Sequence, residues 1–294
     1  MCIVVSHVTL PFLNDVLALR LYTCTEGEVC RWPAPVIVLC HGFAGVQEMV
    51  LPEVAQTFAR KGFVVVTFDY RGFGGSGGER GRLTPARQQE DIRVVLRWVR
   101  DNPILDERRV GLWGTGLGGG HALCVASRNP QVCCVVSQMP LLNGESLITR
   151  GMSFADREDF LQGLEERAVR RRIDDKELWV PVSHLIRDRA SLQFFHQQRR
   201  SCPAMANRIP YLTLHELRYF QVLPFARAVE QPTLMVMAEQ DHLMSLVELQ
   251  EVYDALGSVK LLFTVPGARH YDLYHSPWRD EALLVQLAWF QDHL

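Results

Sequence analysis

A glycine-rich turn is the feature that most constrains how this chain folds. Residues 114–118 read Gly-Thr-Gly-Leu-Gly, and two further glycines follow at 119 and 120. The apolar run 109–113 before the turn has the pattern of a buried strand, and residues 122–126 after it form the start of a helical pattern. Glycine permits a strained backbone and a close approach of neighbouring segments. The sequence therefore predicts a strand that passes through a tight turn directly into a packed helix.

Strand and helix patterns alternate along most of the chain. Segments 6–12 and 16–24 predict an antiparallel hairpin, and helical patterns begin later at the N-cap residues Thr84 and Ser245. Such alternation is typical of α/β proteins, so we expect a doubly wound, mostly parallel, eight-stranded sheet with helices on both faces. Six buried strands of the parallel type are predicted at 36–40, 63–69, 109–113, 132–137, 233–238 and 260–265.

The alternation stops at Pro140 and resumes near Gln231. The residues between them are richer in Arg, Gln and Phe and contain no convincing strand pattern. With 294 residues, of which 48% are apolar, the chain can bury one large core. We therefore expect one core domain formed by residues 1–139 and 231–294, with residues 140–230 inserted as a helical cap.

The composition limits the cellular compartments and the classes of binding partner that we expect for this protein. The 31 basic and 33 acidic side chains give a net charge of −2, which provides no general attraction to nucleic acid or to anionic lipid. No apolar run is long enough to span a bilayer, and we find no secretory signal. We expect a cytoplasmic monomer or homodimer that acts on small molecules. Its eight cysteines form no C-x-x-C pair and are predicted to be reduced; they lie at positions 2, 24, 30, 40, 124, 133, 134 and 202.

The turn at 114–118 matches the nucleophile elbow G-x-S-x-G at every position except the centre. On this motif the chain resembles the α/β-hydrolase superfamily along its whole length, apart from the cap. The loop 69–78 is similar to the D-x-R-G-x-G-x-S-x-G-type loop of esterase-like, peptidase-like and polyketide-transferase-like members with a helical cap. The resemblance implies an α/β-hydrolase sheet whose active site lies at the elbow.

The resemblance also implies an acid and a histidine, which follow the nucleophile in the chain. Asp241 follows the predicted strand 233–238, and His270 follows the strand 260–265. A carboxylate that fixes the tautomer of an imidazole prepares it to take a proton from a nucleophile or from water. Glu239 and His275 are the alternatives for the acid and the base, and we rank them second.

An oxyanion hole is implied by the loop 40–45 directly after the first parallel strand. The backbone N–H groups of Phe43 and Leu117 are expected to converge on a developing oxyanion. His41 is interpreted as a structural residue of this loop and not as a base. His41, Gly42 and Tyr70 are expected to contribute to the wall of the substrate pocket.

Glycine at position 116 departs from the family pattern at the attacking residue. Without a hydroxyl or thiol there, no acyl-enzyme forms by the usual route, and Thr115 is aimed elsewhere on the turn. Three explanations stay open. Gly116 replaces serine in an ordinary hydrolase, or the protein is a natural relative with non-covalent chemistry such as water activation or cyclisation, or it is a catalytically silent binding protein.

A different interpretation arises from Gly114, Gly116 and Gly119, which spell the dinucleotide fingerprint G-x-G-x-x-G. That fingerprint needs an acidic residue at the end of the next strand, but the first acid here is Glu145. The turn also follows at least two earlier parallel strands. We therefore do not expect dinucleotide binding, and we predict no cofactor and no metal, since no metal-ligand motif is present.

These observations favour an acyl-ester or thioester hydrolase, or an acyltransferase. The substrate is expected between the carboxyl edge of the sheet and the cap. Phe194 and Phe195 in the cap suit a small apolar acyl or polyketide-like chain.

Overall fold

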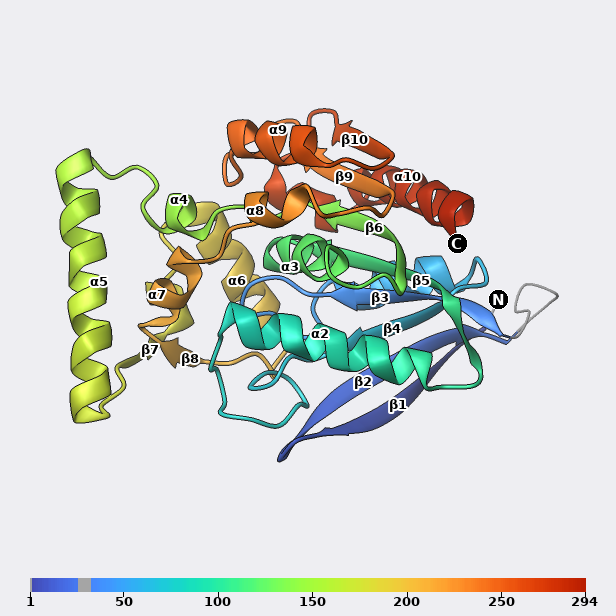
Figure 1. The fold of residues 1–294 in the computed structure, drawn as a ribbon, viewed down its shortest axis with the longest axis horizontal. Helices are drawn as coiled ribbons and strands as arrows, with labels where there is room; N and C mark the ends of the chain where they lie inside the picture. The colour runs from blue at the N-terminus through green and yellow to red at the C-terminus, as the bar shows by residue number, and fades with distance from the viewer. Residues whose placement is uncertain (1, 26–32) are drawn as a thin grey trace.

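A computed structural model describes residues 2–25 and 33–294 (Figure 1). Its centre is an eight-stranded sheet in the order β1-β2-β4-β3-β5-β6-β9-β10. Strands β1 and β2 form an antiparallel hairpin, β2 pairs antiparallel with β4, and all later pairs are parallel. The predicted eight-stranded, mostly parallel sheet is therefore confirmed. Its strands are β1 (Ile3–Phe12), β2 (Asp15–Cys24), β3 (Ala34–Cys40), β4 (Val64–Phe68), β5 (Leu105–Thr115), β6 (Val132–Gln138), β9 (Thr233–Ala238) and β10 (Lys260–Val265).

Alternate residues of the central strands enter two separate hydrophobic clusters. In β3, Val36 and Val38 face one cluster, whereas Ile37 and Leu39 face the other. This two-residue period is what a strand buried on both faces requires. Outside residues 140–230, the first cluster receives side chains from the helices α2 (Pro85–Arg100), α3 (Leu117–Ala126) and α9 (Leu246–Ala255), and the second from α1 (Leu51–Ala59) and α10 (Trp278–His293).

The N-cap predictions are confirmed in position, but the two caps differ in chemistry. Ser245 precedes α9, and its side chain accepts a hydrogen bond from the backbone N–H of Glu248. Thr84 precedes α2, but its side chain accepts no capping hydrogen bond. Pro85 at the first helical position has no N–H group and a fixed φ, which favours the helix start without a side-chain cap.

Most of the segment between β6 and β9 lies beyond one end of the sheet, with α5 (Phe154–Asp174) farthest from it, whereas α8 (Leu223–Ala226) lies against α3 and α9 (Figure 1). One expectation for this segment is wrong: it contains two short strands, β7 (Trp179–Pro181) and β8 (Arg208–Pro210), which pair antiparallel. Strands of three residues are too short to show an alternating pattern. The remaining elements are α4 (Gly144–Ile148), α5 (Phe154–Asp174), α6 (Arg189–Ser201), α7 (Thr213–Arg218), α8 (Leu223–Ala226) and the short 3₁₀ helix Val182–His184.

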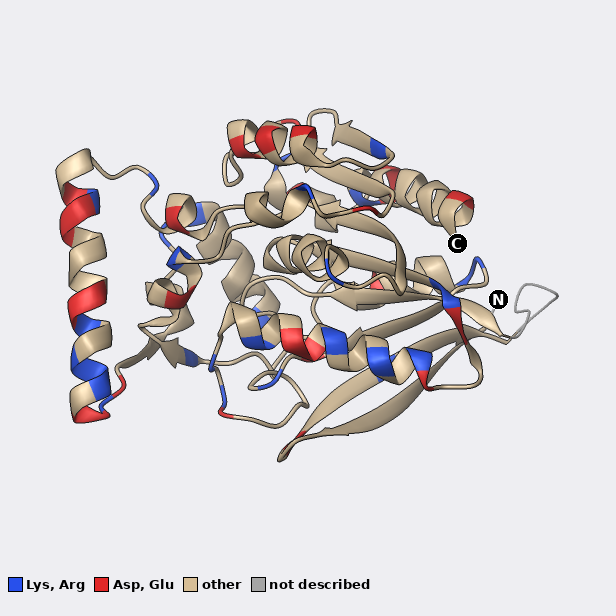
Figure 2. Cartoon of the chain, in the orientation of Figure 1, with Lys and Arg blue, Asp and Glu red and all other residues tan. Residues whose placement is uncertain are grey.

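Charge is unevenly distributed along α5, because acidic residues occur along its whole length, whereas four of its five arginines lie in its second half (Figure 2). Two of these arginines have partners, since Arg171 forms an ion pair with Glu177 and Arg167 lies over the ring of Tyr211. The arginines at 167 and 170–172 thus lie in the carboxyl-terminal turns of one helix, where positive charge is favourable.

Among the described residues, no helix has the length and apolarity needed to cross a membrane. The cysteines at positions 2, 40, 124, 133, 134 and 202 are free thiols. Cys30 lies outside the described residues. Burial raises the pKa of the Cys40 and Cys124 thiols to about 12, so both stay protonated at neutral pH.

Candidate active site

The elbow has the backbone of a nucleophile turn. Strand β5 ends at Thr115, helix α3 starts at Leu117, and Gly116 between them has φ of 57° and ψ of −123°. The N–H of Gly116 donates to the carbonyl of Gln138 at 3.0 Å, and its own carbonyl accepts from the N–H of Leu141 at 2.9 Å. These contacts hold the turn against the last residue of β6 and the segment that follows it, so the conformation of the turn is fixed.

The glycines on either side of Gly116 are required by packing. A Cβ atom on Gly114 would lie 2.1 Å from the carbonyl oxygen of Gly118, and one on Gly118 would lie 2.2 Å from that of Cys40. Backbone atoms cannot yield to such contacts. These two positions therefore exclude every side chain.

Gly116 itself is different, because the space beside it is open. The nearest atom to a Cβ there is the Cα of Gly42, at an ordinary contact distance of 3.9 Å. Only the positive φ favours glycine, and strain of this kind is tolerated at functional turns. The elbow thus has room for a side chain, or for a reacting group of a bound molecule, at the position where the resemblance places the nucleophile.

The structure brings Asp241 and His270 together. His270 is the first residue of the short 3₁₀ helix η2 (His270–Tyr274), and its Nδ1 lies 2.8 Å from Oδ2 of Asp241. Oδ1 of Asp241 accepts hydrogen bonds from the backbone N–H groups of Leu243 and Met244 at 2.7 and 3.1 Å. The carboxylate is thereby fixed, and it orients the imidazole as a general base requires.

Electrostatics favour the ionised form of Asp241. Burial opposes ionisation, but the hydrogen bond from His270, the charge interaction with that ring and the two backbone N–H groups outweigh it, so the pKa of Asp241 lies below its ordinary value. Nε2 of His270 has no hydrogen-bond partner within residues 2–25 and 33–294. It is the nitrogen that is available to a reacting group.

The two alternative residues occupy other environments. Glu239 accepts a hydrogen bond from the N–H of Gly267 at 2.7 Å and so stabilises the loop before His270. His275 follows η2 and is exposed. The acid and base ranked first in the sequence are therefore the ones that pair in the structure.

The loop after β3 places Gly42 beside the elbow, where a Cβ on Gly42 would lie 3.3 Å from the carbonyl of Thr115. The backbone N–H groups of Phe43 and Leu117 donate to no acceptor among the described residues. Both groups are thus free to donate to an oxyanion, and their role as an oxyanion hole stays a prediction. His41 is buried and its Nδ1 lies 3.1 Å from the carbonyl of Gly42, so the ring supports this loop from within the core.

Three residues expected to line the pocket are corrected to interior positions. Tyr70 is completely buried, with its ring 4.5 Å from that of His41 and 5.0 Å from that of Phe68. His41 and Phe195 are also buried. Each was placed in the pocket wall from its position in the sequence, but the packing of the loop and of α6 turns it inward.

Two tyrosines of η2 were missed in the sequence. The hydroxyl of Tyr274 shares a hydrogen bond of 2.8 Å with that of Thr115, the residue immediately before Gly116. Burial raises the pKa of Tyr274 to about 12, so the phenol remains protonated. Because this bond joins the histidine helix to the elbow, it positions His270 relative to Gly116. The only sequence signal was the short spacing of the tyrosines after His270.

Tyr271 connects the same helix to the inserted segment. Its hydroxyl donates to Oγ of Ser191 at 2.7 Å, and its ring stacks on Phe194 with centroids 4.3 Å apart. The ring of Phe194 also lies 5.3 Å from that of Tyr274. Phe194 is therefore part of an aromatic cluster beside His270.

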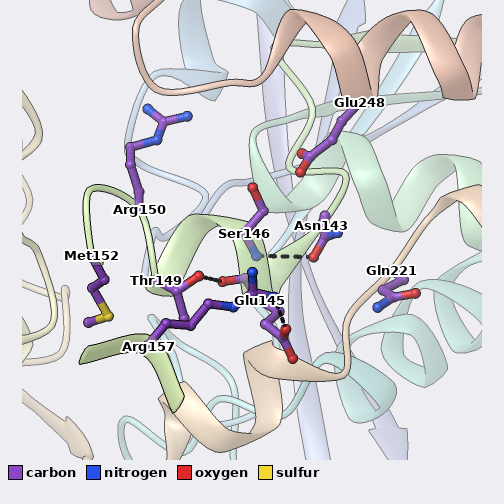
Figure 3. Close-up of a pocket in the computed structure, with 9 residues that line it drawn as sticks. All are labelled: Asn143, Glu145, Ser146, Thr149, Arg150, Met152, Arg157, Gln221 and Glu248. Atoms are coloured by element: carbon purple, nitrogen blue, oxygen red, sulfur yellow. Dashed lines mark hydrogen bonds and ion pairs between the residues drawn. The ribbon is translucent and has the colours of Figure 1, made fainter. Parts of the chain in front are cut away.

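A cavity of about 420 Å³ is lined mainly by residues in and around α4, by the start of α5 and by α9 (Figure 3). Arg150 in its lining donates a hydrogen bond to the carbonyl of His242, the residue after Asp241. Thr149 and Arg157 both bond to Glu145, so much of the lining is already paired within the protein. None of its residues belongs to the elbow, the oxyanion loop or η2. The lining residues are Asn143, Glu145, Ser146, Thr149, Arg150, Met152, Arg157, Gln221 and Glu248.

Within the described part of the chain, no group of three or more His, Cys, Asp or Glu side chains is arranged to hold a metal ion. The groups that the site does present are an imidazole, a carboxylate and backbone N–H groups. Such a set can activate a hydroxyl group or a water molecule and stabilise negative charge on a carbonyl oxygen.

The sheet order, the elbow after β5 and the acid and histidine loops after β9 and β10 define an α/β-hydrolase. Residues 32–275 match the family model described as serine aminopeptidase, S33, and the chain belongs to this family. It is 40% identical over 283 residues to a 31.7 kDa protein from the traX-finO intergenic region of Escherichia coli, covering 96% of this chain and 98% of that protein.

Two further similar proteins come from fungi. A polyketide transferase of Aspergillus fumigatus is 27% identical over 273 residues, which cover 88% of this chain and 90% of the relative. The crystal structure of the α/β-hydrolase GrgF from a Penicillium species has a TM-score of 0.80 at 22% identity and covers 98% of both chains. The structural likeness confirms the fold.

Proposed function

We propose that the protein hydrolyses or transfers the acyl group of an ester or thioester, and that the attacking oxygen belongs to water or to an acceptor hydroxyl. The observation that carries the proposal is the hydrogen bond between Asp241 and His270, on a short helix that bonds through Tyr274 to the residue before the open position at Gly116. In this proposal Asp241 is the acid, His270 is the base, and the N–H groups of Phe43 and Leu117 are the oxyanion donors. Only the attacking atom has to come from outside the chain.

The reaction follows from these groups. Nε2 of His270 takes the proton of the attacking O–H as its oxygen bonds to the acyl carbon. The negative charge that develops on the carbonyl oxygen is stabilised by the N–H groups of Phe43 and Leu117. The tetrahedral intermediate then collapses, the carbon–oxygen or carbon–sulfur bond breaks, and His270 returns the proton to the leaving alcohol or thiol.

Esters and thioesters fit this site better than peptides. The family description names a serine peptidase, but position 116 supplies no hydroxyl for covalent catalysis. An amide is less reactive towards a water molecule than an ester or a thioester, so it depends more on a covalent nucleophile. The similarity to a polyketide transferase supports an acyl chain of small apolar or polyketide-like character, and the aromatic cluster around Phe194 suits such a chain.

We further propose that residues 140–230 act as a cap over this site. The support comes from α6, whose Ser191 and Phe194 contact Tyr271 directly beside His270. Access to the imidazole therefore depends on how this segment lies.

Turnover of a panel of p-nitrophenyl esters and acyl thioesters tests the function. We expect measurable turnover by the unmodified protein and a decrease in kcat/KM of about 10² to 10⁴-fold in the His270→Ala variant. His275→Ala, which removes the exposed neighbouring imidazole, is the matched control and should retain activity. Equal turnover in all three proteins, or binding of acyl compounds without turnover, would overturn the proposal and favour a catalytically silent protein.

A further inference from the structure

Helix α5 leaves most of its surface uncovered. Only three of its 21 residues, Leu161, Leu164 and Ala168, are buried, and their spacing places them on one side of the helix. Towards the protein, α5 packs against α7, and its opposite side faces away from the rest of the molecule (Figure 1). Helices in proteins gain most of their stability from packing. A helix of this length with so few buried residues therefore has a face available for a partner.

The uncovered side is a continuous surface, which we call the outer face of α5. It is formed by residues 155, 159, 162, 166, 169, 170 and 173, which recur every three or four positions and are all exposed. Val169 is 50% exposed and Ile173 is 76% exposed, and Phe154, at the first helical position, is 81% exposed. Exposed apolar side chains that are grouped, and not scattered singly, mark interaction surfaces.

The unpaired charges of α5 differ in sign between its two halves. Glu158 and Asp159 lie in the first half, and Arg170 and Arg172 lie in the second. Among the described residues, none of these four side chains forms a hydrogen bond or an ion pair. The other three arginines of the helix do have partners within the chain. The charges that remain for a partner are therefore negative at one end of α5 and positive at the other.

We propose that the outer face of α5 binds the same face of a second copy of this chain, with the two helices antiparallel about a two-fold axis. An axis between residues 164 and 165 places Asp159 of each copy opposite Arg170 of the other, because the two residues lie equally far from that point along the helix. The same axis brings Phe154 of one copy towards Ile173 of the other, at both ends of the contact. The face is thus complementary to itself in both charge and apolar character.

The charge pattern favours a second copy over other occupants. A partner of one charge sign, such as a nucleic acid or an anionic membrane, is attracted by one half of the face and repelled by the other. A parallel arrangement of two copies puts Asp159 opposite Asp159, which is repulsive. Only the antiparallel pair satisfies both halves. The net charge of −2 on each chain opposes association only weakly.

The size of the contact sets its expected strength. A helix of 21 residues is about 30 Å long. Two such helices alone bury less than the roughly 1,200–2,000 Å² of a standard stable interface. We therefore expect a reversible dimer that forms at micromolar concentrations and is weakened by salt, which screens exposed charge pairs.

Sedimentation of the unmodified protein at concentrations from about 1 to 100 μM tests for this dimer. We expect the dimer fraction to increase with concentration, and the dissociation constant to rise at least about threefold when salt is raised to about 0.5 M. A protein that stays monomeric over the whole range would overturn the proposal. The measurement does not depend on catalytic activity.

Charge reversal identifies the face. Asp159→Arg and Arg170→Asp each place like charges opposite one another at two symmetric points, so we expect each variant alone to dimerise about tenfold more weakly. An equimolar mixture of the two should recover dimers, because the arginine introduced at position 159 of one copy meets the aspartate introduced at position 170 of the other. Glu251→Arg, at an exposed position of α9, makes the same change in charge as Asp159→Arg and should leave the dimer intact. A mixture that stays monomeric, or a control that is weakened equally, would contradict this interface.

Discussion

The two halves of the candidate active site are held in place by different forces. At the elbow, the geometry is set by backbone atoms that approach so closely that Gly114 and Gly118 exclude any side chain. At the acid and histidine loops, it is set by hydrogen bonds between side chains and from the backbone to Asp241. The elbow lacks a nucleophilic side chain at position 116, whereas the acid and histidine loops carry both of their expected side chains.

This difference explains why Gly116 is compatible with an intact site. Packing determines the residues on either side of position 116, but at position 116 the structure has space for a side chain. Loss or gain of a hydroxyl there alters the chemistry without altering the fold. The two halves should therefore respond differently to substitution.

The largest effect is expected from Gly118→Ala. Its Cβ would lie 2.2 Å from a backbone carbonyl, so the strand and the helix must separate, and overpacking of this kind costs about 3 kcal/mol or more of unfolding free energy. Gly116→Ala, the matched control, adds only the strain of a positive φ, about 1–2 kcal/mol. Urea unfolding of both variants measures the contrast. Equal losses would show that packing does not distinguish the two positions.

Asp241→Asn should act on the other half of the site. The neutral amide no longer stabilises a positively charged imidazole, so we expect kcat/KM for the best ester to decrease by about 10²-fold. The folded-state pKa of Asp241 is depressed, so its stabilisation is present above the unfolded pKa and is lost as the pH falls through the folded value. Urea unfolding at neutral and at strongly acidic pH should therefore show a smaller acid loss in the variant. An unchanged acid loss would refute this linkage.

The smallest effect is expected where the two halves meet. Tyr274→Phe removes the hydrogen bond to Thr115, which should cost about 1 kcal/mol of unfolding free energy. We expect kcat for the best ester to decrease more than KM changes, because His270 is less well placed while the binding surface persists. Tyr271→Phe, which leaves the Thr115 contact intact, is the comparison. If kcat decreased only in Tyr271→Phe, the position of His270 would depend on the contact with Ser191 in the inserted segment and not on the contact with Thr115.

The sequence was most informative at positions where packing or topology allows only one type of residue or one arrangement. The spacing of the glycines predicted the elbow because close backbone approach leaves no other residue possible. The order of the strands placed Asp241 and His270 at adjacent loops, because parallel strands end at the same edge of the sheet. Both predictions depended on local pattern and on topology, which the sequence expresses directly.

Contacts that depend on the path of irregular segments could not be predicted. Tyr271 and Tyr274 reach Ser191 and Thr115 only because η2 turns as a 3₁₀ helix. Tyr70 was expected in the pocket wall, but the loop after β4 directs it into the core. A side chain that lies between a loop and a helix carries no periodic signal in the sequence.

Labelling of the Gly116→Ser variant with a fluorophosphonate probe tests the central claim most directly. If the site is a hydrolase site that lacks only its nucleophile, the serine variant should be labelled at residue 116, and Gly116→Ser combined with His270→Ala should react far more slowly. A folded serine variant that remains unlabelled, or one whose labelling does not depend on His270, would contradict the account.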